Sequence, residues 1–286
     1  MKNKVVRIIL IIGFCVGLII SLYPLISNMY SKRNQINVIN EYKEEVENTD
    51  EDKLASEREL ANMYNRKLNQ TIVLSDPFDP NAIKMADEMY YEILDFAKDG
   101  VMGYIDIPKI NVNLPIYHGT DDEHMQKGVG HLTGTSFPIG GVDTHAVLSA
   151  HSGLSSADLF TNLPDLNKGD LFYIHVLDEI LAYKVDKITV VKPDETDDLK
   201  IVKGEDYVTL VTCTPYGINS HRLLVRGHRV PYSPEKEKEE EKKVNNNVWF
   251  NEYIKSIVSG IVIIIVLVII IVLIKKCKCI LRRNKK

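Results

Sequence analysis

The sequence is poor in cysteine, with four in 286 residues, and three of these lie near the ends of the chain. Cys15 falls within an apolar stretch, and Cys277 and Cys279 lie in a basic C-terminal tail. The tail pair lacks the second pair that a zinc site requires. Cys213 therefore has no partner in the middle of the chain with which to form a disulfide. Such a cysteine is either an inert buried thiol or a free reactive one, and composition leaves both readings open.

Acidic residues are missing from both ends. Residues 1–30 and 255–286 contain no Asp or Glu, so all 39 acidic residues lie between them. Ten of the 35 basic residues flank two apolar stretches, which leaves 35 − 10 = 25 and a formal charge of 25 − 39 = −14 for the middle. A region this acidic is a poor candidate for binding nucleic acid or an anionic surface.

The two apolar stretches, Ile8–Tyr30 and Ser256–Ile274, contain no charged residue and have 23 and 19 residues. Both are near the roughly 20 residues that a helix needs to cross a bilayer. Basic residues precede the first stretch and follow the second, which predicts cytoplasmic termini and a middle region outside the membrane. A cleaved signal peptide is the alternative for the first stretch, but that stretch is long for one and lacks an A-x-A-like site. An uncleaved anchor is therefore favoured.

The region after the first stretch alternates between helical patterns and breaks. Residues 31–70 are rich in charge and have apolar residues at helical spacing, which predicts one or two amphipathic helices or a charged spacer. Leu74–Pro80, with the sequence LSDPFDP, contains two Asp-Pro steps that exclude helix and favour an extended loop. A helical pattern resumes at Met85–Phe96. Pattern alone assigns no role to Phe78, which stands between the two prolines.

From Gly103 the sequence changes to short apolar or alternating runs separated by turn residues. One further short segment, Ser156–Leu163, has a helical pattern. Repeated short strands of this kind predict a mainly β fold, either a barrel or a sandwich. The predicted strands are Gly103–Ile107, Val112–Tyr117, His145–Ala150, Leu171–Val176, Ala182–Val191, Tyr207–Cys213 and Leu223–Val230.

Cysteine catalysis needs a thiolate, a proton-transfer partner and a group that stabilises an oxyanion. The sequence offers eight histidines, of which His151 follows a strand and precedes a turn, a position from which a side chain can reach a cleft. Strand alternation puts Arg222 and Arg226 on one face of the last strand, and Arg222 lies nearer the end of the Cys213 strand. Pattern alone does not decide among the histidines or between the two arginines.

The segment TLVTC at Thr209–Cys213, followed by TPYGINSHRLLVRG, closely resembles the active-site signature of sortases, specifically the class C pilin polymerases of Gram-positive bacteria. The resemblance extends to GYIDIPKINVNLPIYHGT, GVGHLTGTSFPIGG and VLSAHSGL, and covers about Gly103 to Val230. It implies an eight-stranded sortase barrel. By the same resemblance Cys213 is the nucleophile, His151 transfers protons and Arg222 supports substrate and oxyanion, which leaves Arg226 a structural role. The sequence AHSG around His151 departs from the GH pair of many relatives.

The resemblance also gives the Asp-Pro segment a role. Class C enzymes carry a lid with an Asp-Pro-aromatic motif over the active site, and Asp76-Pro77-Phe78 matches it. We expect Asp76 to pair with the Arg222 guanidinium and Phe78 to cover the Cys213 sulfur. Two membrane spans around the barrel are also usual in that class.

Together these features predict a mainly β protein: an eight-stranded sortase β-barrel with N-terminal helices and a lid, flanked by two transmembrane helices. The predicted regions are 1–30, a transmembrane anchor; 31–70, a charged helical or spacer region; 71–100, the lid loop and helix; 101–232, the catalytic barrel; 233–255, a charged tether; 256–274, a transmembrane helix; and 275–286, a basic cytoplasmic tail.

The resemblance further implies a membrane-anchored cysteine transpeptidase without cofactor or metal. Its partners would be secreted pilins or surface proteins with LPXTG-like sorting signals, and a pilin lysine amine would be the acceptor. The alternatives are a sortase that anchors proteins to peptidoglycan and a non-enzymatic membrane-tethered binding barrel. A papain-like protease is disfavoured because its cysteine signature is missing.

Overall fold

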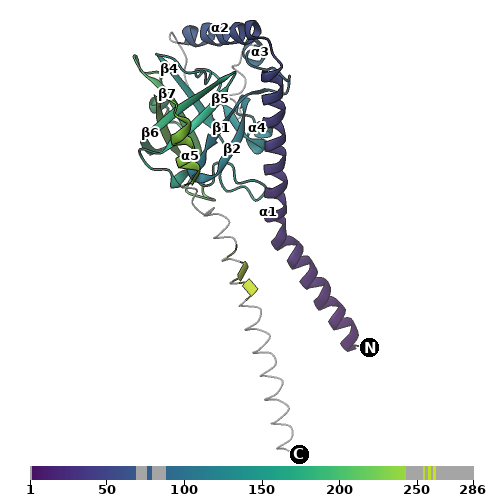
Figure 1. Ribbon diagram of the computed structural model, residues 1–286. Coiled ribbons are helices and arrows are strands. Elements are labelled where there is room, and N and C mark those ends of the chain that lie inside the picture. The colour runs from purple at the N-terminus through teal and green to yellow at the C-terminus, as the bar shows by residue number, and fades with distance from the viewer. Residues whose placement is uncertain are drawn as a thin grey trace, which may run out of the picture. The chain divides into compact units, whose positions relative to one another are not determined.

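The structure, a computed structural model, describes residues 2–68, 76–78, 88–242 and, beyond them, 254, 257, 258, 260 and 261 (Figure 1). The chain divides into two compact units, residues 1–245 and 246–286. The predicted tail, and all but a few positions of the second predicted span, lie outside the described residues. So do most of the Leu74–Pro80 loop and the start of the predicted Met85–Phe96 helix.

Eight strands form a closed barrel in the order β1-β2-β3-β4-β7-β8-β6-β5, which confirms the expected barrel. Two neighbouring pairs, β2 with β3 and β4 with β7, are parallel, and the others are antiparallel. The strands are β1 (Val101–Ile107), β2 (Val112–His118), β3 (Val129–His131), β4 (Thr144–Ser149), β5 (Leu171–Val176), β6 (Glu179–Val191), β7 (Asp206–Thr214) and β8 (His221–Val230).

The strands form because their apolar residues alternate and so share one buried face. Along β8, Leu223 and Val225 belong to the main core, as the alternation predicts, while Leu224 packs in a second cluster. The barrel interior is tightly packed around Gly227, because a Cβ atom added there would lie 2.5 Å from the ring of Phe172. Burying a Phe side chain contributes roughly 2–3 kcal/mol. Gly227→Ala would therefore force the Phe172 ring from its place.

Five α-helices accompany the barrel in the described part of the chain. They are α1 (Lys2–Glu47), α2 (Glu51–Leu68), α3 (Glu88–Glu92), α4 (Asp122–Lys127) and α5 (Pro234–Lys242). The helical spacing predicted for residues 31–70 is confirmed, since Ile39, Tyr42 and Val46 of α1 are buried. The α1 helix lies alongside the barrel and contacts β1 and β2 (Figure 1). It continues without interruption through residue 30, the predicted end of the membrane anchor.

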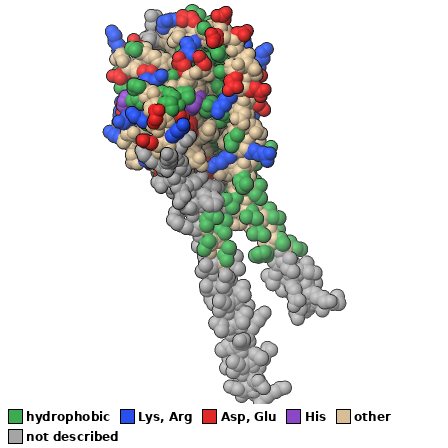
Figure 2. All heavy atoms as spheres, viewed as in Figure 1, with side chains coloured by type: hydrophobic (Ala, Val, Ile, Leu, Met, Phe, Trp, Pro, Cys, Tyr) green, Lys and Arg blue, Asp and Glu red, His purple; other side chains and the backbone are tan. Residues whose placement is uncertain are grey.

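The N-terminal part of α1 is apolar and exposed. In the described part of the chain, one helix is long and apolar enough to cross a membrane, and little of its apolar stretch is buried. Figure 2 shows hydrophobic side chains gathered along this part of α1, while acidic and basic side chains are dispersed over the barrel. Exposed residues such as Phe14 and Ile19 would be unfavourable in water but not in lipid. This exposure supports the predicted membrane anchor.

Polar contacts join α1 to the segment between β4 and β5. The Asn28 side-chain amide donates to Oδ2 of Asp158 at 2.9 Å and accepts from the Asp158 backbone N–H at 3.0 Å. Lys32 Nζ lies 2.9 Å from the same carboxylate. Both Asn28 and Asp158 are buried, so these bonds satisfy groups that would otherwise be costly to remove from water. The helix is therefore fixed to the barrel just after its exposed apolar part.

The helix predicted at Ser156–Leu163 is wrong: the segment consists of turns and bends, followed by a 3₁₀ turn at Leu163–Asp165. Two of its backbone N–H groups, those of Asp158 and Phe160, bond to partners outside the segment instead. Phe160 N–H donates to the His151 carbonyl at 3.1 Å, and Leu159 has a φ of 42°, which a right-handed helix excludes. Likewise, α3 ends at Glu92, before the predicted Phe96, because Leu94 has a φ of 64°.

Candidate active site

Cys213 and Arg222 face each other across two neighbouring strands. Cys213 is the penultimate residue of β7 and Arg222 the second residue of β8, and the antiparallel register pairs them directly. The connecting loop also holds the arginine, since Nη1 of Arg222 donates to the carbonyls of Asn219 at 3.0 Å and His221 at 3.2 Å. A short loop between antiparallel strands thus brings a thiol and a fixed guanidinium to one end of the sheet.

His151 reaches the same place because β4 runs parallel to β7. The register pairs Ser149 with Val211, and the contact continues beyond the strand. The Thr212 hydroxyl donates to the Ala150 carbonyl at 2.8 Å, and the Ser152 hydroxyl donates to the Cys213 carbonyl at 2.9 Å. Residues 150–152 therefore lie along residues 211–213. The three residues that the sequence singled out are brought together at one end of β4, β7 and β8.

Asp76 binds Arg222 as expected. Nε of Arg222 donates to Oδ1 at 2.8 Å and Nη2 donates to Oδ2 at 2.6 Å, a bidentate geometry that favours strong pairing. The two side chains are 15% and 11% exposed, respectively. The segment turns locally because the Phe78 N–H also donates to Oδ1 of Asp76, at 3.4 Å, across Pro77. The Asp76 carboxylate thus takes up two of the N–H donors of Arg222 that a developing oxyanion would need.

Phe78 lies against both other polar groups of the site. Its ring centroid is 5.7 Å from that of His151 and 4.9 Å from the Arg222 guanidinium carbon. Phe78 also packs on a cluster of buried side chains on the face of the sheet opposite the main core. We call this group the outer apolar cluster: Leu132, Val147, Leu199, Val211 and Leu224. Phe78 therefore fills an apolar surface beside Cys213; that its ring covers the sulfur stays a prediction.

The closed arrangement disfavours the charged forms of the reacting pair. Burial raises the pKa of the Cys213 thiol, Arg222 opposes this, and the Asp76 carboxylate adds to it. Burial lowers the pKa of His151, and the nearby Asp122 carboxylate partly offsets the effect. Both shifts favour a neutral thiol beside a neutral imidazole.

Asp122 is a neighbour of the site that the sequence analysis missed. Its Oδ1 lies 3.7 Å from Nε2 of His151, although its side chain is 85% exposed. It opens α4, for which Asp121 is the N-cap. The acidic run Asp121 to Glu123 was the available signal, but a charged run of this kind is usually only a solvated surface.

Two of the other candidates, Arg226 and His131, have partners outside the site. Arg226 is bound by Asp186, Nε to Oδ1 at 3.1 Å and Nη2 to Oδ2 at 2.7 Å. Buried His131 bonds to Tyr90 and to the Ser136 carbonyl, and its ring is neutral because burial lowers its pKa to about 3. These contacts place Arg226 and His131 in the framework around the site.

Comparison with known proteins matches the barrel to one family. Residues 105–230 match the Sortase domain family. The curated relative Sortase D of Bacillus subtilis (strain 168) is 31% identical over 131 residues, which cover 45% of this chain and 63% of that protein. The chain thus spans less than two thirds of the length of the curated relatives that it matches.

Solved structures match more closely. Sortase C-1 from Actinomyces oris is 51% identical with a TM-score of 0.59, covering 63% of this chain and 99% of that one. The structure of the pilus-related Sortase C of Group B Streptococcus is 45% identical with a TM-score of 0.62, covering 67% of this chain and 96% of that one. These structures therefore share both the barrel and nearly half of the aligned residues.

Proposed function

Because this chain belongs to the sortase family, we propose that it is a cysteine transpeptidase that cleaves LPXTG-like sorting signals through a thioester on Cys213. The observation that carries the proposal is the direct pairing of Cys213 with Arg222 in the β7–β8 register, with residues 150–152 alongside. A thiol, an imidazole and a fixed cation at one sheet end supply the three groups that acyl transfer by cysteine requires.

In the first half-reaction Cys213 loses its proton to His151 and the sulfur attacks the scissile carbonyl carbon. The carbonyl oxygen becomes an oxyanion, which Arg222 stabilises. When the tetrahedral intermediate collapses, the C–N bond breaks and His151 donates its proton to the leaving amine. The products are a thioester on Cys213, a neutral imidazole and the released C-terminal fragment.

In the second half-reaction an amine attacks the thioester carbon. His151 takes a proton from the attacking amine, a new amide bond forms, and the sulfur leaves as thiolate and recovers the proton. We propose that the acceptor is a lysine side chain of the next pilin subunit, so that repeated turnover joins subunits. The support is the likeness to C-type sortases, one of them pilus-related, at 45–51% identity over almost their whole chains.

Anchoring of surface proteins to a peptidoglycan amine is the second candidate. The observation in its favour is that the chain is also 32% identical to Sortase A of Streptococcus agalactiae over 117 residues. Both candidates share the thioester and differ only in the acceptor. Offering the acyl-enzyme a lysine-containing pilin or a peptidoglycan-type amine therefore separates them by the mass of the product.

We further propose that Asp76, Pro77 and Phe78 form a lid that a substrate must displace. Asp76 occupies the Arg222 guanidinium and Phe78 packs against His151. The cost of desolvating a buried ion pair offsets much of its Coulomb attraction, so such a pair fixes geometry more than it adds stability. An ion pair with little net stabilisation suits a segment that substrate must displace. Releasing both contacts, by Asp76→Ala with Phe78→Ala, should raise the rate of peptide cleavage.

The apolar part of α1 supports a location for the protein. We propose that its apolar part anchors the protein in the cell membrane and that the barrel lies on the outer side, with both termini in the cytoplasm. The exposed apolar side chains of α1 support the anchor, and the flanking basic residues support the orientation. We propose that residues 256–274 form the second span, which returns the C-terminus to the cytoplasm.

The decisive test of the proposed function is Cys213→Ala in the full chain, purified in detergent. With an LPXTG-like peptide the variant should form no acyl-enzyme by mass spectrometry, and cleavage should fall by at least about 10³-fold because the nucleophile is gone. Cys15→Ala is the matched control, because Cys15 lies exposed on α1, and it should behave as wild type. Undiminished cleavage in Cys213→Ala would sink the assignment.

A further inference from the structure

The face of the sheet beside the site carries its side chains in successive rungs. From Cys213 down β7, the next residue on this face is Val211, which pairs with Leu224, and the one after is Thr209, which pairs with Arg226. The apolar rung belongs to the outer apolar cluster. The rung below it is polar, and the connection from β6 to β7, residues 192–205, is attached there.

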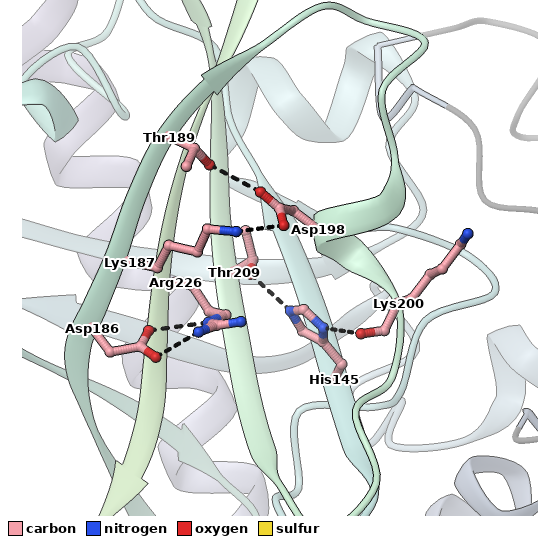
Figure 3. A network of polar contacts seen from close by, with 8 residues as sticks. All are labelled: His145, Asp186, Lys187, Thr189, Asp198, Lys200, Thr209 and Arg226. Atoms are coloured by element: carbon pink, nitrogen blue, oxygen red, sulfur yellow. Dashed lines mark hydrogen bonds and ion pairs between the residues drawn. The ribbon is translucent and has the colours of Figure 1, made fainter.

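The first attachment is His145 on β4 (Figure 3). Its Nδ1 lies 2.8 Å from the Lys200 carbonyl oxygen and its Nε2 lies 2.7 Å from the Thr209 hydroxyl. Burial lowers the pKa of His145 to about 4, so the ring is neutral at neutral pH. A carbonyl can only accept, so Nδ1 carries the hydrogen and Nε2 accepts from the hydroxyl. The ring therefore ties the β6–β7 connection to β4 and β7 at once.

The second attachment is Asp198, in the 3₁₀ turn η4 (Asp197–Leu199) of the same connection. Lys187 Nζ lies 2.6 Å from Oδ1 of Asp198, and the Thr189 hydroxyl donates to Oδ2 at 3.3 Å. Both partners belong to β6 (Figure 3). The lysine and aspartate side chains are 38% and 32% exposed, so the pair contributes little to stability. Its main effect is to fix where the connection lies.

Leu199 lies between the two attachments, one residue from each. It is buried and packs in the outer apolar cluster against Val147, Val211 and Leu224, the same cluster on which Phe78 rests. Three members of this cluster, Val147, Val211 and Leu224, belong to strands and cannot shift independently. Leu132 follows β3, and its N–H donates to the Val147 carbonyl of β4 at 2.9 Å. Leu199 comes from the β6–β7 connection, so its position depends on the attachments on either side.

We propose that Asp198, Lys187 and His145 are positioning residues that hold Leu199 in place and thereby set the enzyme's selectivity for an apolar substrate side chain. The proposal rests on the proposed function, since it needs a peptide that displaces Phe78 and enters beside Cys213. The occupant is defined by chemistry: an aliphatic side chain of the sorting signal takes the surface that the Phe78 ring leaves. The three positioning residues do not touch the reacting atoms.

The test compares Asp198→Ala with Asp197→Ala in the full chain. Asp197 is the matched control: it pairs with Lys200 within the connection at 2.5 Å, and its side chain is 91% exposed. The substrates are two LPXTG-like peptides, one with the leucine and one with alanine in its place. Asp198→Ala should raise KM for the leucine peptide about tenfold and leave kcat within about twofold of wild type. It should also reduce the ratio of kcat/KM for the leucine peptide to kcat/KM for the alanine peptide. Asp197→Ala should change neither.

Two further measurements keep the outcome clear. Hydrogen exchange of residues 192–205 should quicken in Asp198→Ala and not in Asp197→Ala, whether or not the enzyme turns over. The reversed pair, Lys187→Asp with Asp198→Lys, should regain leucine preference that each single change loses. Equal KM, preference and exchange in the two alanine variants would overturn the proposal. A wild-type chain that cleaves neither peptide would overturn the proposed function instead. In that case the hydrogen exchange of residues 192–205 still shows whether Asp198 holds the β6–β7 connection in place.

Discussion

Two arginines on β8, four residues apart, make nearly the same contacts in different settings. Arg222 is bound bidentately by Asp76 and lies over the ring of Phe78 at 4.9 Å; Arg226 is bound bidentately by Asp186 and lies over the ring of Tyr207 at 4.1 Å.

The difference between the two sites lies in where the partners come from. Asp186 and Tyr207 belong to β6 and β7, the strands on either side of β8. Tyr207 pairs with His228 of β8, and Asp186 lies at a register shift between Val185 and Lys187, which both pair with β8, so the sheet holds both residues in place. Asp76 lies 146 residues upstream of Arg222, and the described residues of its segment, 76–78, form no strand or helix. One pair therefore fastens the barrel, whereas the other can come apart without breaking it. Equal contacts do not imply equal function.

The largest effect that would test this comparison comes from changing each arginine to lysine, which keeps the charge and removes the planar fork. Arg222→Lys should lower kcat/KM for an LPXTG-like peptide by about 100-fold, because oxyanion stabilisation depends on the geometry of the donors. Arg226→Lys should retain activity within about threefold and lower the thermal midpoint by about 5 °C. Equal losses of activity in the two variants would erase the distinction.

A smaller effect is expected from removing both partners of each arginine. Asp76→Ala with Phe78→Ala should raise peptide cleavage about tenfold, because the closed form no longer competes with substrate. The matched control is Asp186→Ala with Tyr207→Ala, which should lower the thermal midpoint without raising cleavage. Unchanged cleavage and unchanged Cys213 labelling in the first variant would count against a lid.

The smallest effect concerns the pH at which Cys213 reacts. The Asp76 carboxylate raises the pKa of the thiol and Arg222 lowers it. Asp76→Ala therefore leaves Arg222 unopposed, so more thiolate is present at a given pH and the alkylation profile moves to lower pH. The rate is followed on the peptide that contains Cys213, with Asp186→Ala as the control that should not shift. A shift to higher pH would contradict the inferred electrostatics.

Local pattern was enough to predict most of the barrel. The strand Leu171–Val176 has the predicted bounds, and the other six predicted strands differ by up to three residues at an end. The two faces of β8 are also as predicted, because alternation is set by the backbone itself. Closure into eight strands came from the resemblance, since no local signal counts the strands of a sheet.

The failures share a physical cause. The strand β3, Val129–His131, is three residues long and is a strand only because β2 and β4 flank it. Ser156–Leu163 has helical spacing, but Asp158 is used by Asn28 of α1 and Phe160 by the backbone after β4. Partners far away in the sequence determine the secondary structure of both segments, and a short window of sequence does not contain those partners.

The same holds for the site. Placing Cys213 near Arg222 needed only the short loop between two strands, which sequence does reveal. The contact of Asp76 with Arg222 was predicted from the resemblance, because the local pattern around Asp76 indicated only a loop with two prolines. Asp122 and Leu199 were not foreseen, since each lies near the site only through the closure of the barrel and the course of the β6–β7 connection.

The unbroken α1 helix and its polar contacts with Asp158 have a mechanical consequence. From Tyr30 to Glu47 the helix rises about 25 Å at 1.5 Å per residue. Because Asn28 and Lys32 fasten the barrel at the base of that rise, the barrel cannot swing as it would on a flexible leash. With α1 in the bilayer, the remaining motions of the barrel are rotation about the helix axis, a shared tilt and bending at Pro24, where the helix lacks a backbone donor. Cys213 would then work at a set height above the membrane, and the substrate must come to that height.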